Sequence, residues 1–261
     1  EENFDEVFDG TGMVAMPGMT DAHVHLGCLF AKGEFPVDYA TVLTVAKCKD
    51  ALMAGFTTFR DAGSVSEGLK LAFDEGVLPG PRIYPCGAYI SQTCGHGDSE
   101  YAHTYRDIQY RHPSSTVLVD GVPEIIRAVR EQFYRGASHI KLMATEILNR
   151  HEDIRLLFGT DMMITGPDYQ VEQSEDIRYY EKRFGTMRAL RALTGTANEV
   201  FALTTYQNPY PKGKIGVLEA GSYADLLLVD GDPTKSVSVL ADTDHLRLIM
   251  KGGTVYKNTL C

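Results

Sequence analysis

Two kinds of hydrophobic pattern alternate along this chain, and they predict its order of strands and helices. Short apolar or β-branched runs bounded by glycine, proline or polar residues are typical of buried strands, whereas apolar residues recurring every three to four positions are typical of helices. The predicted strands cover residues 19–26, 55–61, 82–90, 139–145 and 154–161. The predicted helices cover residues 37–54, 65–78, 123–135 and 175–203, the last with an interruption at Gly185. This alternation favours parallel strands joined by crossover helices, which is an α/β fold.

The carboxyl-terminal part of the chain has a different pattern. Short strand-like runs at residues 224–230, 246–250 and 254–257 follow one another without a helix of the earlier kind between them. Near the amino terminus, residues 6–9 form another short run of this type. We therefore predict a small β annex in addition to the α/β part of the chain.

Composition and charge exclude several classes of partner. The 261 residues are 44% hydrophobic and 23% charged, which is ordinary for a globular protein, and the formal net charge is −10. Because no basic patch stands out and no apolar run approaches ~18 residues, we expect neither nucleic-acid binding nor a membrane span. The five cysteines form no CxxC pair, which favours free thiols in a reducing compartment and predicts a cytoplasmic location.

Side chains that could build a metal site stand at the ends of several predicted strands. They are His23, His25, Asp61, His96, Lys141 and Asp161. His23 and His25 are two residues apart in a strand, so both imidazoles face one side, and neutral imidazole is a common zinc ligand. Taken singly, these residues have ordinary alternatives: a surface histidine pair, a snorkelling or ion-paired lysine, and a turn aspartate. Their combination favours a site, because strand ends and the loops after them assemble the sites of α/β barrels.

Six segments spread over nearly the whole chain carry a family pattern. They are PGMTDAHVH (17–25), GFTTFRDAG (55–63), GHGD (95–98), HIKLMAT (139–145), FGTD (158–161) and ADLLLV (224–229). Together they resemble the amidohydrolase superfamily, and within it the branch of imidazolonepropionase-like proteins and metal-dependent prolidases. The resemblance implies a distorted TIM (β/α)8 barrel with a small β-sandwich annex formed by both termini. On that basis we expect the annex in residues 1–15 and 204–261 and the barrel in residues 16–203.

The resemblance also implies a site with two divalent metal ions, zinc in most members. His23 and His25 would bind the first metal, and Lys141 would be carboxylated so that its carbamate bridges both metals. Asp161 would complete the first metal's ligands and shuttle a proton during catalysis. His96 would donate a hydrogen bond to the substrate or its oxyanion, although a loop-fixing hydrogen bond is an equal alternative. Two cations lower the pKa of a bound water, which makes hydroxide available near neutral pH.

The chain departs from the family pattern in two ways. The family has two further metal-binding histidines after the fifth and sixth barrel strands, and no histidine of this sequence matches them. Only five barrel strands are predicted, whereas a closed barrel needs eight, so about three βα units, or roughly 90 residues, are lacking. We predict that the missing units belong at a gap near residues 145–147.

These features predict a metal-dependent hydrolase that cleaves the amide bond of dipeptides or N-acyl amino acids, in the manner of an Xaa-Pro dipeptidase. Loop residues such as Tyr105 or Arg111 could hold the free carboxylate of this small-molecule substrate. One alternative is a cyclic-amide hydrolase of the imidazolonepropionase type. Another is a metal-free amidohydrolase-like scaffold, which the two missing histidines would support. We further expect a homo-oligomer.

Overall fold

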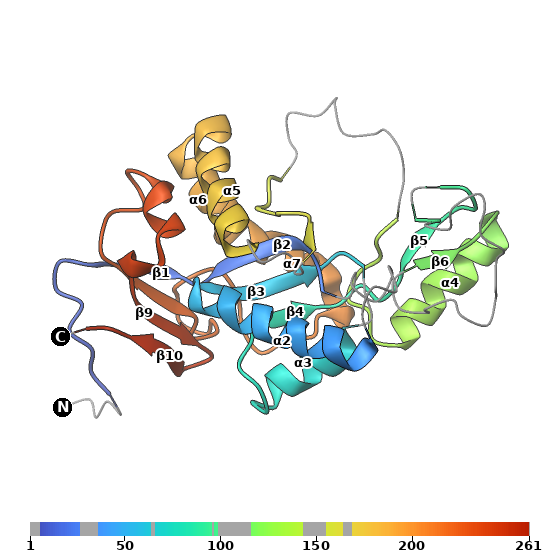
Figure 1. Cartoon of the computed structure of the whole chain (residues 1–261), viewed down its shortest axis with the longest axis horizontal. Coiled ribbons are helices and arrows are strands. Elements are labelled where there is room, and N and C mark those ends of the chain that lie inside the picture. The colour runs from blue at the N-terminus through green and yellow to red at the C-terminus, as the bar shows by residue number, and fades with distance from the viewer. Residues whose placement is uncertain are drawn as a thin grey trace.

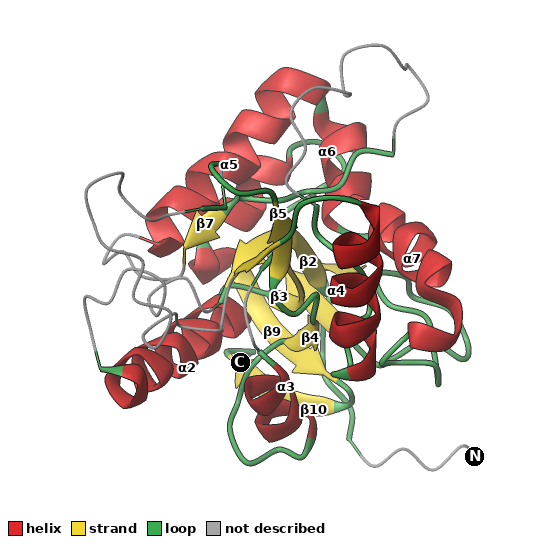
Figure 2. Ribbon diagram, turned by 90° about the vertical axis from the view of Figure 1, so that its right-hand side faces the viewer, coloured by secondary structure: helices red, strands yellow, loops and turns green. Residues whose placement is uncertain are grey.

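Two β-sheets lie next to each other in the computed structural model, and helices surround the strands (Figures 1 and 2). The structure describes residues 6–26, 36–63, 66–95, 97–98, 116–142, 155–163 and 169–260. One sheet is parallel, with the strand order β4-β3-β2-β7, and the other is antiparallel, with the order β1-β8-β9-β10. The parallel strands are β2 (Met19–His25), β3 (Phe56–Asp61), β4 (Arg82–Tyr84) and β7 (Met162–Met163). The predicted α/β fold is therefore confirmed.

All the predicted helices form, but only those at residues 37–54 and 123–135 keep their expected bounds; the one at 65–78 is shorter, and the one at 175–203 begins at Tyr169 and is divided into three. They are α2 (Val37–Met53), α3 (Glu67–Asp74), α4 (Val122–Tyr134), α5 (Tyr169–Phe184), α6 (Thr186–Leu193) and α7 (Gly195–Phe201), with the 3-10 helix η2 (Ala202–Gln207) directly after α7. Gly185 interrupts the helical sequence as predicted, because it adopts a φ of 82° that favours glycine and separates α5 from α6. Gly55, with a φ of 87°, likewise follows the end of α2.

The parallel sheet is buried on both faces, and each face has its own core. Phe59 and Ile83 belong to the large core that the outer helices and the annex cover. Tyr84 is on the opposite face and packs in a second cluster with Phe201 and Tyr210. The Tyr84 and Phe201 rings stack with centroids 3.8 Å apart. The end of α7 therefore closes over the inner face of the sheet.

The segment predicted as one strand, residues 82–90, is two strands in different sheets. β4 ends at Tyr84, and β5 (Tyr89–Ser91) pairs instead with β6 (Thr116–Leu118). The intervening Pro85 has no N–H to donate to a ladder, and Gly87 has a φ of 68° that no regular strand contains. The prediction was wrong here because it read an apolar run without its breakers.

The last two predicted barrel strands are less regular than expected. Residues 155–161 run beside β2 without a continuous ladder, and the short β7 begins only after Asp161. Of residues 139–145, those described show one bridge, between Ile90 and Leu142, so the regular strand expected there is not seen in the described part. The predicted gap near residues 145–147 lies outside the described residues. Closure into an eight-stranded barrel accordingly stays a prediction.

The annex contains strands from both parts of the chain, although its first strand differs from the prediction. Its strands are β1 (Val14–Pro17), β8 (Leu226–Val229), β9 (Leu246–Lys251) and β10 (Thr254–Asn258), accompanied by the 3-10 helices η3 (Val237–Ala241) and η4 (Thr243–His245). Residues 6–9, which we predicted as a strand, are irregular. The annex strand is instead formed by residues 14–17, which pair with β8.

Two other expectations concern helices and thiols. None of the helices in the described part of the chain combines the length and apolar character that crossing a bilayer requires. Cys48 and Cys86 are buried free thiols, and Cys94 is an exposed one.

Candidate functional site

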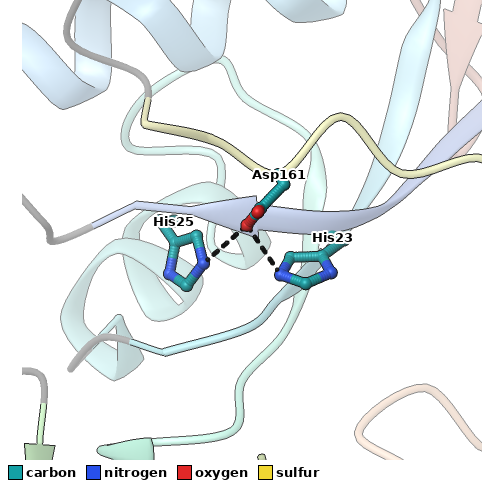
Figure 3. A group of neighbouring side chains, drawn as sticks. All are labelled: His23, His25 and Asp161. Carbon is teal, nitrogen blue, oxygen red and sulfur yellow. Dashed lines mark hydrogen bonds and ion pairs between the residues drawn. The ribbon is translucent and has the colours of Figure 1, made fainter. Parts of the chain in front are cut away.

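The end of β2 carries the two histidines that the sequence singles out. Strand geometry places residues 23 and 25 on the same side of β2. The ring centroids of His23 and His25 lie 5.3 Å apart (Figure 3). His25 is buried and His23 is half-buried, so a solvent-exposed pair is not what the fold builds.

Asp161 meets both histidines although it is far from them in sequence. Its backbone N–H donates to the His23 carbonyl oxygen at 2.8 Å, which fixes it beside β2. Its φ of 57° is one that aspartate tolerates better than most residues. Oδ1 of Asp161 lies 2.9 Å from Nε2 of His23 and 3.1 Å from Nε2 of His25 (Figure 3). Three potential ligand atoms thus lie within 4.8 Å of one another.

Lys141 completes the group of four residues that the sequence predicted. Its Nζ lies 3.0 Å from Nε2 of His23. The chain at Lys141 is held beside β5, because the Ile90 N–H donates to the Lys141 carbonyl oxygen at 2.9 Å. Burial lowers the pKa of Lys141, and the Arg60 cation adds to this effect while Asp161 opposes it. The lowered pKa increases the fraction of neutral amine at a given pH.

The arrangement fits a divalent cation. Two imidazole nitrogens and one carboxylate oxygen are the donor set of many catalytic zinc sites, which keep a further position open. A metal ligand must be a neutral imidazole, and burial together with the Lys141 ammonium lowers the pKa of His23 against the opposing effect of Asp161. The group therefore has the donor atoms that metal binding requires, and the lowered pKa of His23 favours the neutral ring that a ligand needs.

A buried carboxylate beneath the site ties its two parts together. Oδ1 of Asp21 accepts from the backbone N–H groups of His23 and Thr160, each at 3.2 Å. Oδ2 accepts from Oγ1 of Thr160 at 2.9 Å and from Nε2 of Gln173 at 3.1 Å. Burial raises the pKa of Asp21 to about 7, although these hydrogen bonds oppose the shift. Asp21 thereby links the strand of His23 to the residue before Asp161.

Three other residues considered from the sequence have different outcomes. His96 lies outside the described residues. Asp61 faces away from the site, and its Oδ1 is an acceptor for the backbone N–H groups of Leu26 and Gly63 at 3.4 and 3.3 Å. Nδ1 of His139, a residue that matched no family ligand, lies 2.9 Å from the Ser138 hydroxyl, and His139 lines a cavity together with Arg60 and Tyr84.

Sequence reasoning gave no role to Asp21 or to Arg60, which also approaches this region. Arg60 resembles Lys141 in being a cation within a strand, and the other residues of its strand are all buried. Asp21 could have been found in a similar way, because a carboxylate within a buried strand needs hydrogen-bond donors around it. Applying one criterion to every ionisable residue in a strand would have found both.

The amidohydrolase family model matches residues 14–153, which is more than half of the chain. Ochratoxinase from Aspergillus niger is 34% identical over 152 residues, 51% of this chain and 31% of that protein, so the chain spans about a third of the length of the curated relatives it matches.

Solved structures show the same architecture. An amidohydrolase crystal structure is similar with a TM-score of 0.82 and 22% identity, over 100% of this chain and 91% of that one. A prolidase complexed with N-methylphosphonate-L-proline is similar with a TM-score of 0.72 and 20% identity, over 95% and 88% of the two chains. At these identities the similarity concerns the fold, a TIM-barrel-like α/β fold. With the family pattern present over residues 14–153, this chain belongs to the amidohydrolase family.

Proposed function

We propose that this chain carries the site of a metal-dependent hydrolase that cleaves the amide bond of dipeptides or N-acyl amino acids. Membership of the amidohydrolase family supports a hydrolase of carbon–nitrogen bonds. The similarity to a prolidase and to an ochratoxinase supports an amide substrate. We also propose that the parallel strands belong to a (β/α)8 barrel spanning residues 16–203, flanked by the annex segments 1–15 and 204–261.

The observation that carries this proposal is the convergence of His23, His25 and Asp161 on one point, with Lys141 in contact. In the proposed site these four residues hold one or two divalent ions, zinc being the ion that this donor set suits best. Such an ion, when bound, would polarise the amide carbonyl and lower the pKa of water.

Asp161 is the residue placed to move a proton. Its side chain is 72% exposed, so the carboxylate is open to solvent and substrate even though one oxygen faces the histidines. A carboxylate in this position can accept the proton of an attacking water and donate it to the leaving amine. The backbone hydrogen bond from Asp161 to the His23 carbonyl oxygen supports this role, because it holds Asp161 beside the two histidines.

Lys141 has the environment that a carbamate requires. Carbon dioxide reacts with a neutral amine, so that a C–N bond forms and one proton leaves, and burial favours the neutral amine here. An ammonium has no lone pair and cannot bind a cation, whereas a carbamate offers two anionic oxygens. His96 stays our candidate for a hydrogen bond to the substrate.

Two alternatives rest on particular features. The metal-free scaffold has one feature in its support, because none of the eight histidines of the sequence stands at a position expected for the second metal. A cyclic-amide hydrolase of the imidazolonepropionase type uses the same metal chemistry, and only the substrate separates it from the favoured function.

Zinc loading of the purified chain tests the proposal. We expect bound zinc, hydrolysis of a panel of dipeptides and N-acyl amino acids, and loss of both on chelation. Asp161→Asn should lower kcat by about 100-fold or more with the fold intact, since it removes the proton acceptor. Asp9→Asn is the matched control, because Asp9 is an exposed carboxylate that only holds a turn with Thr11.

Two results would contradict the proposal. Hydrolysis that is unaffected by chelation or by Asp161→Asn would remove the metal and the proton shuttle from the mechanism. A folded chain that binds no zinc and cleaves none of the panel would favour the scaffold.

A further inference from the structure

Tyr89 is a buried aromatic residue beside the candidate site, and the function proposed above gives it no role. It is the first residue of β5. Its ring meets the His25 ring edge-on, with the centroids 6.5 Å apart and the ring planes at 83°. Aromatic pairs prefer this distance and arrangement. Tyr89 therefore packs against a proposed metal ligand without being one of the four residues assigned to the metal.

This contact connects two sheets that no strand ladder joins. β5 pairs with β6, whereas the two histidines lie on β2 of the parallel sheet, and no pairing between these sheets is found in the described part of the chain. Lys141 is held on the side of β5, because the Ile90 N–H donates to its carbonyl oxygen at 2.9 Å. The position of Lys141 relative to the histidines consequently depends on packing between the sheets. Tyr89, the residue before Ile90, supplies such packing.

Two glycines enclose the ring of Tyr89. Gly63 has a φ of 148°, which favours glycine, and a Cβ atom at this position would overlap the Tyr89 ring. Near another edge of the ring, a Cβ atom at Gly97 would lie 2.7 Å from Cε2 of Tyr89, closer than side chains pack. The segments that follow β3 and β5 therefore hold the ring in one position.

Gly63 also connects Tyr89 to the orientation of His25. Nδ1 of His25 lies 3.5 Å from the Gly63 carbonyl oxygen, and Nε2 of the same ring lies 3.1 Å from Oδ1 of Asp161. A hydrogen bond from Nδ1–H to a backbone carbonyl orients a ligand histidine and leaves the lone pair of Nε2 for a metal. Tyr89 thus packs against both the His25 ring and the residue whose carbonyl faces it.

We propose that Tyr89 is a positioning residue of the metal site, whose ring keeps Nε2 of His25 directed at the point that it shares with His23 and Asp161. The inference rests on the proposed metal-dependent function and adds a residue to it. The aromatic ring has this role and not the hydroxyl, because no hydrogen bond in the described part of the chain uses that hydroxyl. Tyr89→Phe should therefore keep the site intact, and Tyr89→Leu should loosen it.

Zinc affinity, measured by competition with a chromophoric chelator, tests the role. We expect Tyr89→Leu to weaken zinc binding about 10–100-fold, as for other residues that orient metal ligands, and Tyr89→Phe to remain close to wild type. The absorption bands of bound Co²⁺ report ligand geometry and should change in Tyr89→Leu only. Tyr84→Leu is the matched control, because Tyr84 is a buried tyrosine that stacks on Phe201. It should lower stability and leave zinc affinity unchanged.

Double variants separate positioning from a general effect on the fold. If Tyr89 acts through His25, Tyr89→Leu should not weaken the residual zinc binding of His25→Ala any further. In His23→Ala the same substitution should still weaken binding, because His25 remains there to be misplaced. A tyrosine that only stabilised the fold would have equal effects in both backgrounds.

Gly97→Ala tests the role if Tyr89→Leu fails to fold. It leaves Tyr89 in place, while its methyl group presses on the Tyr89 ring and on the Ser91 side chain. We expect it to weaken zinc binding in the wild-type and His23→Ala backgrounds but not in His25→Ala.

Proton NMR of the metal-free protein follows His25 independently of zinc and of catalysis. Tyr89→Leu, or Gly97→Ala in its place, should shift the His25 ring resonances and leave those of His245, in the annex, unchanged. A wild-type chain that binds no zinc would remove the proposed function, and these resonances alone would then decide the role of Tyr89. Unchanged His25 resonances, unchanged zinc affinity in the variant, or a loss that persists in His25→Ala would each overturn it.

Discussion

Arg82 and Arg60 lie on neighbouring strands of one sheet and have opposite surroundings. At the start of β4, Arg82 forms an ion pair with Asp225, and the two side chains are only 6% and 1% exposed. Near the end of β3, Arg60 has no acidic partner among the described residues and faces a cavity. The same residue type is thus neutralised at one end of the sheet and left available at the other.

The surroundings of Arg82 are complete in other respects. Its guanidinium lies 4.3 Å from the Tyr223 ring centroid, a cation–π distance. Asp225 accepts a further hydrogen bond from the Gly252 N–H at 2.8 Å. These contacts join the parallel sheet to the annex, because Asp225 directly precedes β8 and Gly252 follows β9. Arg82 and Asp225 are thus both paired within the described part of the chain.

The comparison suggests how to separate stabilising polar groups from functional ones. In parallel α/β folds the strand ends that carry chemistry are the carboxyl ends, whereas polar groups at the amino ends serve stability. Here the amino end has a closed ion pair. The carboxyl end gathers two histidines, two cations and three carboxylates, which are His23, His25, Lys141, Arg60, Asp21, Asp61 and Asp161. The polar groups at the carboxyl end are therefore the candidates for function.

Among the variants that test this comparison, we expect Asp225→Asn to change stability the most. Removing one member of a buried ion pair leaves the Arg82 cation uncompensated, which typically costs about 3–5 kcal/mol. We expect the free energy of unfolding, measured by urea titration, to fall by that amount. Activity per folded molecule should be unchanged, because Asp225 lies at the other end of the sheet.

Asp230→Asn is the control for this experiment. Asp230 is five residues further along, 58% exposed, and pairs with Arg247 at 3.6 Å. Exposed pairs contribute roughly 0–1 kcal/mol, so this variant should be nearly neutral. If Asp225→Asn lowered the free energy of unfolding no more than Asp230→Asn does, the ion pair at the junction would not be what stabilises this end of the sheet.

The sequence predicted which side chains would converge better than it predicted the strands that carry them. His23 and His25 were predictable because residues two positions apart in a strand point to the same side. The buried strand β2 has this geometry. Asp161 was placed at the end of a strand, whereas it precedes β7 in a left-handed conformation. The long-range contact of Asp161 with the histidines depends on how β7 pairs with β2, which no local pattern encodes.

The choice of pairing strand also explains where the predicted fold was wrong. Residues 82–90 divide between two sheets because β4 pairs with β3 while β5 pairs with β6. The annex takes β1 as its first strand because residues 14–17 pair with β8, whereas residues 6–9 have no strand partner in the described part of the chain. Hydrophobic pattern predicts that a segment is extended, but the neighbour it pairs with is decided by the whole fold.

We expect Asp21→Asn to have an intermediate effect. It tests the carboxyl end of the sheet, where the candidate site lies. Asp21 accepts four hydrogen bonds and holds Thr160 beside His23, so it positions Asp161 without touching the metal-site atoms itself. An asparagine replaces one acceptor oxygen with an amide that can only donate. We expect zinc affinity to fall about 10–100-fold, as for other residues that orient metal ligands.

A competition titration with a chromophoric chelator measures this loss. Thr160→Val is the comparison, because it removes only the hydroxyl hydrogen bond to Asp21 and keeps the one from the backbone N–H. Its effect on zinc affinity should be smaller than that of Asp21→Asn. Unchanged affinity in Asp21→Asn, with normal thermal unfolding, would show that the site does not depend on this carboxylate.

We expect the smallest change in stability from Lys251, a second cation at the amino end of the parallel sheet. It donates to the Gly80 carbonyl oxygen, and burial, together with Arg82, lowers the pKa of its ammonium to about 8 against the opposing effect of Asp225. In the unfolded chain the pKa is near the ordinary lysine value of about 10.4. Between these two pKa values the unfolded state binds more protons than the folded state.

Stability should therefore rise with pH in this window. From pH 8 to pH 9 we expect wild type to gain about 1 kcal/mol relative to Lys251→Met, whose side chain does not titrate. Urea unfolding of both proteins at the two pH values measures the difference. Lys235→Met, at a lysine whose side chain is 83% exposed, is the control and should show no such gain. A wild type that loses stability relative to Lys251→Met over this interval would mean that the folded junction keeps Lys251 charged. The amino end of the sheet would then hold an excess cation too, and its contrast with the Arg60 end would disappear.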